Sequence, residues 1–380
     1  MTLVVNSKQV GKRKVEHFAR LFYFVTKPNL ILRKTSSFLK SINYIFALMN
    51  RLWIAILGVL VACADQHQNE VLVQNIGFAQ GSTYNVQYLS PNATDYQWEV
   101  DSILLEIDSS LSTYQHYSLI SKLNQGDTNI FLDEHFVKVF KAFQSVADST
   151  QGKFDCTLAP IVNAWGFGFT EKTKVDSLLI QSLLHKVGYQ KVTLKGDSLL
   201  CNPNLLQLDF NALAQGYTVD VIAAFLDSME LQNYMVEVGG ELKTNGKNAN
   251  GKNWLIGIDK PSPEIDDNNR FQTVIELPNK ALATSGNYRN FYLENGEKYA
   301  HTIDPETGYP VKHKLLSVTV VTEDCMLADA YATAFMVMGI QKTKRYLQIH
   351  PELDAYLIYT NRKGEWETWA TPDFSQLQVN

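Results

Sequence analysis

The chain has 380 residues, of which 45% are hydrophobic and 19% are charged, and its formal net charge is −5. This composition predicts a globular protein with a hydrophobic core and excludes a disordered or fibrous chain. The length allows one large domain or two closely joined ones.

The N-terminal region contains a short apolar segment of the kind found in export signals. Within residues 49–62, Arg51 precedes an apolar run from Leu52 to Ala62 that is too short to span a bilayer comfortably. The run ends in Leu60-Val61-Ala62-Cys63, which resembles a bacterial lipobox. We therefore expect 49–62 to be a lipoprotein signal peptide. Cys63 is then the lipidated first residue of a mature protein anchored to the membrane on the extracytoplasmic side of the cell envelope. A buried core helix or a retained anchor is the alternative.

Residues 1–48 do not fit this interpretation, because a signal peptide normally opens a chain. They carry nine Lys and Arg against one acid, Glu16. We expect Met49 to be the true start and 1–48 to be an upstream extension, with a basic nucleic-acid arm as the alternative.

Removal of residues 1–62 leaves 24 Lys and Arg against 38 Asp and Glu, a net charge of −14. Such a surface excludes non-specific nucleic-acid binding, and a multi-phosphate ligand would need a metal or local amides. Cys156, Cys201 and Cys325 remain after Cys63 and show no CxxC spacing. This argues against a zinc site and a disulfide framework, and leaves a single disulfide open.

The predicted elements begin after residues 63–78, which comprise the lipidated cysteine and a linker. Apolar spacing predicts helices and period-two alternation predicts strands. The helices are expected at 96–110, 133–149, 177–187, 212–230, 327–338 and 341–349. The strands are expected at 82–88, 205–210, in alternation over 233–294, at 317–322 and at 355–359. Without strict βαβ alternation, this order predicts an α+β domain over 79–380. Neither a GxGxxG motif after a strand nor a P-loop is present.

Asp329 and Thr333 lie in an apolar helical pattern that Gly339 closes. Residues four apart share one helix face, and a carboxylate beside a hydroxyl suits a hard cation such as Mg²⁺. The alternative is a capping Asp and a back-bonding Thr in a packed helix. The apolar flanks favour the metal site, because a buried Asp needs a partner.

His301 stands at a strand end just before the turn Asp304-Pro305-Glu306-Thr307-Gly308. Proline fixes φ in such a turn and glycine supplies an unusual φ, so the loop is rigid enough to aim an imidazole. Histidine is the natural general base near neutral pH. A structural histidine is the alternative.

Four further segments combine glycine with small or aromatic residues. Residues 208–217 pass from a strand into a helix through small side chains, which lets the backbone and the helix amides approach a phosphate. Each segment alone fits an ordinary turn or packing corner equally well. The others are 152–160 with 165–168, 236–241 and 283–289.

Together, in this order and spacing, these segments resemble the ApbE family of FAD:protein FMN transferases, from about Gly81 to about Asp354. Many members of that family also carry a lipoprotein signal. The resemblance implies an α+β fold of mixed, largely antiparallel sheets with packed helices, and an FAD cleft between two subdomains. It rests on Leu111-Ser112-Thr113-Tyr114, Ala214-Gln215-Gly216-Tyr217, Val238-Gly239-Gly240-Glu241, Ala283-Thr284-Ser285-Gly286, His301-x-Ile303-Asp304-Pro305-x-Thr307-Gly308 and Ala328-Asp329-Ala330-x-Ala332-Thr333.

The resemblance also implies residue roles. Asp329 and Thr333 would bind Mg²⁺ together with the main-chain oxygen of Ala212. His301 would take the proton of an acceptor Thr or Ser hydroxyl, which attacks the FMN phosphorus while AMP leaves. The acceptors of the family are subunits of extracytoplasmic electron-transfer complexes. FAD, the substrate, would lie against Gln80, Tyr114, Lys153, Phe154, Asp155, Asp209, Gln215 and Ile303.

Three positions depart from the family pattern. Gln80 stands where Met is frequent, Gln215 where Lys or Glu is common, and Cys156 where an apolar or small residue is usual. The first two bear on FAD contacts, and none touches the proposed metal pair or His301. Two other functions stay open: an FAD pyrophosphatase that uses water as nucleophile, and a flavin-binding lipoprotein without catalysis.

Overall fold

The computed structural model describes residues 70–127, 130–168, 175–196, 198–202, 207–262, 269–287, 291–294 and 297–379. Internal contacts divide the chain into residues 1–67 and 68–380, and the described residues all belong to the second unit. The predicted upstream extension, the signal peptide and Cys63 lie outside the described residues. No helix in the described ranges is long and apolar enough to cross a membrane.

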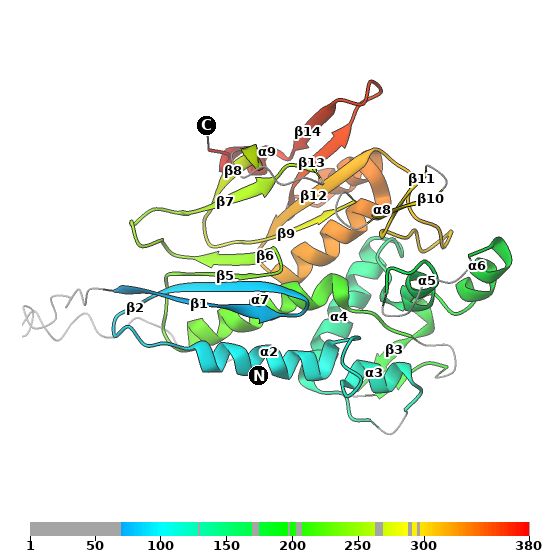
Figure 1. The fold of residues 1–380 in the computed structure, drawn as a ribbon, viewed down its shortest axis with the longest axis horizontal. Helices are drawn as coiled ribbons and strands as arrows, with labels where there is room; N and C mark the ends of the chain where they lie inside the picture. Colours follow the sequence, from blue (N-terminus) through cyan, green and yellow to red (C-terminus); the bar gives the residue numbers. More distant parts are fainter. Residues whose placement is uncertain are drawn as a thin grey trace, which may run out of the picture. The chain divides into compact units, whose positions relative to one another are not determined.

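An eight-stranded antiparallel sheet is the centre of the second unit (Figure 1). Its strands, in spatial order, are β1 (Val71–Ala79), β2 (Ser82–Ser90), β5 (Tyr234–Val238), β6 (Glu241–Asn245), β9 (Ala281–Gly286), β12 (Leu315–Thr322), β13 (Asp354–Thr360) and β14 (Trp366–Ala370). Three two-stranded sheets accompany it: β3 (Thr193–Lys195) with β4 (Ser198–Leu200), β7 (Trp254–Asp259) with β8 (Phe271–Leu277), and β10 (Phe291–Glu294) with β11 (Glu297–Ala300).

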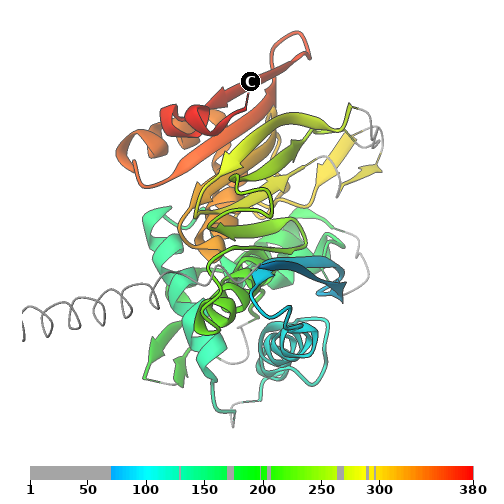
Figure 2. The ribbon, with the colours of Figure 1, turned by 90° about the vertical axis from the view of Figure 1, so that its left-hand side faces the viewer.

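Figure 2 shows the strands of this sheet following one another from β1 and β2 in blue to β13 and β14 in red.

Helices pack against this sheet. α7 packs on β5 and β6, and α8 packs on β9 and β12 and directly against α7. The helices are α2 (Gln97–Leu111), α3 (Leu119–Asn124), α4 (Glu134–Ser149), α5 (Ala159–Ala164), α6 (Ser177–Leu184), α7 (Asn211–Ser228), α8 (Cys325–Ile349) and α9 (Pro372–Leu377), with short 3₁₀ turns at Cys156–Leu158 and Tyr189–Lys191.

Helix α4 shows how local sequence produces this packing. Its N-cap Asp133 accepts a hydrogen bond from the Phe136 N–H at 2.8 Å, which satisfies one of the open amides of the first turn. Phe136, Phe140 and Phe143 follow at helical spacing and are fully buried in the largest core cluster. Phe136 meets Phe210 edge-on, as Phe140 meets Phe143, and all four rings belong to this cluster.

The α+β prediction, with a largely antiparallel sheet, agrees with this architecture. The three described cysteines Cys156, Cys201 and Cys325 are free, so they form no disulfide with one another. β3, β4, β14, α9 and the short helices α3 and α5 were not predicted. The predicted elements that the structure reproduces are helices 96–110, 133–149 and 212–230 and strands 82–88, 317–322 and 355–359.

Two predicted boundaries are wrong. The linker expected over 63–78 is shorter, because β1 begins at Val71 and pairs with β2 along its whole length. The helix expected over 177–187 ends at Leu184. The helices expected at 327–338 and 341–349 are the two parts of α8, which Gly339 breaks with φ of 71°.

The strand predicted over 205–210 is also wrong where it can be tested, since residues 207–210 form no strand. Their backbone bonds go elsewhere: the Asn124 side chain donates to the Leu208 carbonyl at 2.8 Å and accepts from its N–H at 2.7 Å. The Asp209 N–H donates to the Cys156 carbonyl at 2.8 Å. A side-chain amide therefore takes the place of a neighbouring strand.

Candidate active site

A cavity of about 770 Å³ lies among α2, α7, α8, the β1–β2 and β5–β6 turns, the end of β9 and the segment after β11. This volume is typical of small-molecule sites. The cleft was predicted between two subdomains; contacts group residues 68–380 as one compact unit, and the cavity lies within it. All twelve predicted site residues line it: Gln80, Tyr114, Lys153, Phe154, Asp155, Asp209, Ala212, Gln215, His301, Ile303, Asp329 and Thr333.

Gly216 lets α7 and α8 approach closely at one corner of the cavity. A Cβ atom there would lie 2.5 Å from the Cys325 carbonyl oxygen, which only glycine avoids. Ala212, four residues earlier on α7, leaves helical geometry with φ −86° and ψ 17°. The close approach of the two helices places Gly216 against the start of α8, one turn before Asp329.

Asp329 has the environment of a carboxylate that needs a counter-charge. Its side chain is 6% exposed, and its Oδ2 atom has no hydrogen-bond partner among the described residues. Burial raises the pKa of Asp329 to about 7, although the Gly216 N–H favours the charged form. Thr333, one helical turn further on, places its Oγ1 3.1 Å from the Ser285 hydroxyl.

Glu241 adds a second buried carboxylate near this corner. Its Oε2 atom lacks a partner in the described part of the chain, and burial, then the charge of Asp329, raises the pKa of Glu241 well above its usual range. Two uncompensated acids fit a hard divalent cation. The described residues contain no cluster of three His, Cys, Asp or Glu side chains suited to a metal. A cation here would therefore also depend on the Thr333 hydroxyl and the Ala212 carbonyl.

His301 directly follows β11 and begins a tightly bonded turn. The Gly308 N–H donates to the Asp304 carbonyl at 2.8 Å, and Ile303 forms a bridge with Pro310. The buried Trp165 indole donates to the Gly308 carbonyl at 2.8 Å. The His301 ring packs against Phe167 with ring centroids 6.4 Å apart. The predicted turn is confirmed; the catalytic role of His301 stays a prediction.

Lys153, which lies just after α4, forms ion pairs with the turn that follows His301. Its ammonium lies 3.3 Å from Asp304 Oδ1 and also contacts the Glu306 carboxylate, while its side chain is only 11% exposed. The Lys153 charge is therefore already compensated within the protein. Its predicted contact with FAD stays untested, and its observed contacts hold the loop that carries His301.

The Asp155 and Asp209 carboxylates, which line the cavity, accept hydrogen bonds from nearby backbone N–H groups. Asp155 accepts from the Thr157 N–H at 2.8 Å, the Thr157 hydroxyl at 2.7 Å and the Tyr189 N–H at 2.9 Å. Asp209 accepts from the Asn211 N–H at 2.9 Å, just where α7 begins. Burial raises the pKa of both carboxyls, and these N–H groups oppose that rise.

The two unusual glutamines lie in the turn between β1 and β2 and near the start of α7. Gln80 donates to the Thr218 hydroxyl at 2.8 Å, and its buried Oε1 has no partner within the described ranges. That oxygen is an acceptor available to a ligand N–H. Gln215 packs over Gly239, where a Cβ would lie 2.2 Å from the glutamine Nε2. Tyr114, 65% exposed, stands at the rim.

Comparison with known proteins identifies the family. Residues 80–357 match the sequence profile of the ApbE family. The chain belongs to the ApbE family. A Vibrio cholerae protein named FAD:protein FMN transferase is 35% identical over 302 residues, which cover 77% of this chain and 89% of the relative. A Haemophilus influenzae protein of the same name is 36% identical over 326 residues, which cover 82% and 93%.

Solved structures agree with this assignment. The flavin transferase ApbE from Vibrio cholerae matches with a TM-score of 0.73 at 33% identity, over 81% of this chain and 99% of that one. The ApbE protein of Thermotoga maritima matches with a TM-score of 0.71 at 25% identity, over 82% and 100%. The predicted family and ApbE-like α+β fold are thereby confirmed.

The sequence reasoning missed one acid of this ApbE-family cavity. Asp108 of α2 lines the cavity between the apolar neighbours Ile107 and Leu111. Burial raises the pKa of Asp108, while a hydrogen bond with Gln80 lowers it. The available signal was an acid on the apolar stripe of a predicted helix, the same signal that pointed to Asp329.

Proposed function

We propose that this ApbE-family enzyme transfers the FMN moiety of FAD to a Ser or Thr hydroxyl of an acceptor protein, with Mg²⁺ and with release of AMP. Two relatives at 35% and 36% identity are named FAD:protein FMN transferase, and the chain spans 89% and 93% of their lengths. The observation that carries the proposal is the shared cavity. The proposed cation ligands and His301 line the same cavity, whose volume suits a small-molecule ligand.

The chemistry follows from the positions of these groups. The acceptor oxygen attacks the flavin-side phosphorus of FAD, the bond from that phosphorus to the bridging oxygen breaks, and AMP leaves. His301 takes the hydroxyl proton. Asp329, Thr333 and the Ala212 carbonyl would hold Mg²⁺, which when bound neutralises charge on the pyrophosphate and the leaving group. Because Asp329 is buried, water would screen an interaction between its carboxylate and a bound cation only weakly.

The test combines the purified protein, FAD, Mg²⁺ and an acceptor subunit of an extracytoplasmic electron-transfer complex. We expect the acceptor to gain the mass of one FMN group, to stay fluorescent after denaturation in SDS, and AMP to appear in equal amount. EDTA should abolish all three signals. His301→Gly should bind FAD and transfer nothing, whereas His185→Gly, a change at an exposed histidine, should behave like the wild type.

Other results would lead to other functions. FMN and AMP without a labelled acceptor would identify an FAD pyrophosphatase, and flavin binding without AMP would identify a binding protein. Transfer that survives EDTA would refute the metal role. Transfer by His301→Gly at the wild-type rate would refute its role as base.

We also propose that the enzyme acts on the extracytoplasmic side of a bacterial cell envelope, anchored to a membrane by lipid on Cys63 after cleavage of residues 49–62. The apolar run before Cys63 supports this. Metabolic labelling with a radioactive fatty acid checks it. Label that persists in Cys63→Ser would contradict the lipid site.

A further inference from the structure

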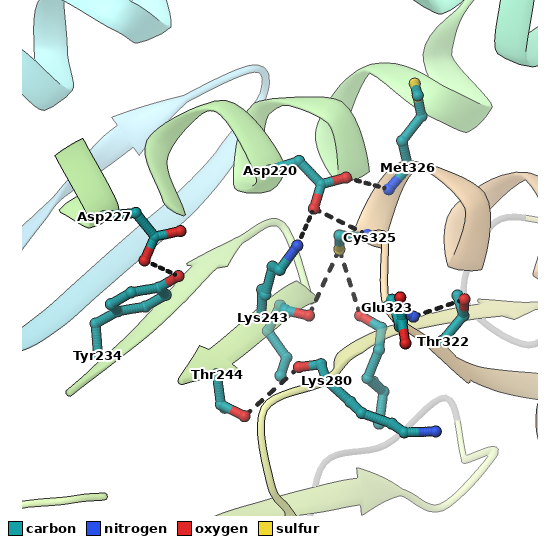
Figure 3. Close-up of polar contacts among 12 residues, drawn as sticks. Asp220, Asp227, Tyr234, Lys243, Thr244, Lys280, Thr322, Glu323, Cys325 and Met326 are labelled. Atoms are coloured by element: carbon teal, nitrogen blue, oxygen red, sulfur yellow. Dashed lines mark hydrogen bonds and ion pairs between the residues drawn. The ribbon is translucent and has the colours of Figure 1, made fainter. Parts of the chain in front are cut away.

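The N-terminus of α8 is capped by a residue of another helix. The N-cap residue Asp324 makes no side-chain cap bond, although the first amides of a helix need acceptors. Asp220 of α7 supplies them: its carboxylate accepts from the Cys325 N–H at 3.1 Å and from the Met326 N–H at 2.9 Å (Figure 3). A charged acceptor at a helix N-terminus is favourable for the helix dipole as well.

Lys243 of β6 completes this arrangement. Its ammonium lies 3.1 Å from the same Asp220 oxygen that accepts from Cys325, and the two side chains are 24% and 13% exposed. Burial raises the pKa of Asp220, and the Lys243 charge and the two amides lower it. Asp220 therefore joins α7, α8 and β6 at one point, as Figure 3 shows.

The spacing on the two helices connects this point with the cavity. Ala212, Gly216 and Asp220 are four apart on α7 and share a face, and Asp329 follows Cys325 by four on α8. Asp220 bonds the Cys325 and Met326 amides of α8, and Gly216 packs against the backbone of the same two residues. Four residues of helix correspond to about 6 Å, so a shift of α8 along α7 would break both contacts together.

We propose that Asp220 is a positioning residue of the cation site. It fixes the register of α8 on α7 at which Asp329 and Thr333 face the same corner as Ala212. Asp220 does not line the cavity, so it acts through α8 and not on the substrate. This inference rests on the proposed cation site.

Asp227 provides a matched control on the same helix. It accepts a hydrogen bond from the Tyr234 hydroxyl at 3.0 Å and thereby links α7 to β5, away from α8 (Figure 3). Asp220→Asn and Asp227→Asn are the same isosteric change. In Asp220→Asn, however, the amide NH₂ would face N–H donors or the Lys243 ammonium.

The experiment measures Mg²⁺ affinity by calorimetry on the purified full-length protein, with the melting temperature beside it. Asp220→Asn should weaken Mg²⁺ binding about tenfold, the loss typical of partners that orient metal ligands. Asp227→Asn should leave the affinity unchanged. The Mg²⁺ concentration for half-maximal transfer should move with the affinity, while the rate at saturating Mg²⁺ moves less.

A folded Asp220→Asn protein with wild-type Mg²⁺ affinity would overturn the proposal, as would equal losses in both variants. If Asp220→Asn does not fold, Lys243→Gln replaces it, because it keeps both cap bonds and removes only the ion pair that orients Asp220. The Mg²⁺ affinity of Lys243→Gln should then fall about threefold, less than in Asp220→Asn because the cap bonds remain. An unchanged Mg²⁺ affinity counts against the proposal. A wild-type protein that binds no Mg²⁺ would instead refute the cation site.

Discussion

Gly216→Ala tests whether the close approach of α7 and α8 builds the site. An added Cβ would lie 2.5 Å from the Cys325 carbonyl oxygen and 2.9 Å from the Met326 Cα. Both atoms belong to the α8 backbone, so no side chain can turn away. Ordinary contact needs about 3.5 Å, hence the two helices must separate by about 1 Å.

The sign of the stability change separates this argument from simple helix propensity. Alanine in a helix is normally more stable than glycine by about 1 kcal/mol. Overpacking costs about 1–3 kcal/mol and opposes that gain. The separation also displaces α8, which carries Asp329 one turn after Cys325. A displacement of about 1 Å in an active site can cost about 100-fold in rate.

We therefore expect Gly216→Ala to melt no higher than the wild type and to transfer FMN about 100-fold more slowly. Thermal unfolding and intact-mass kinetics at several Mg²⁺ concentrations measure both. Ala224→Gly, at an exposed position of α7, measures the propensity contribution alone. A Gly216→Ala protein that is more stable than the wild type and fully active would refute the reasoning.

Two further predictions concern charges along the cavity. The pKa of Asp329 in the metal-free protein is raised to about 7, so Mg²⁺ binding must displace a proton at lower pH. As the pH rises toward about 6.5, the half-saturating Mg²⁺ concentration should fall about tenfold for each pH unit, and it should level off above about pH 8. A flat profile in titrations at constant ionic strength would contradict this. Lys153→Met removes the ion pairs with Asp304 and Glu306. Because the Lys153 side chain is only 11% exposed, its loss leaves the Asp304 carboxylate without its counter-charge, so we expect the free energy of unfolding to fall by about 1–3 kcal/mol and transfer to slow. An unchanged rate would show that the His301 loop does not need these ion pairs.

Local sequence carried much of the fold. The buried Phe136, Phe140 and Phe143 follow from apolar residues at helical spacing after a capping Asp133, and the structure places them as expected. Strand β2 likewise follows from period-two alternation. The strand prediction for residues 207–210 was wrong because their backbone bonds Asn124, more than 80 residues earlier in the chain, and not a neighbouring strand. No local pattern contains such a partner.

By itself, the sequence indicated the residues that could form a site through its resemblance to the ApbE family, and these twelve positions all line one cavity. Short-range spacing was enough to pair Asp329 with Thr333 on one helix face. Only the tertiary structure decided how α7 meets α8. Asp220 and Cys325 are 105 residues apart in sequence, and the Gly216 approach and the cap bonds exist only once both helices pack on the same sheet. Contacts between distant segments depend on three-dimensional packing, which sequence periodicity does not encode.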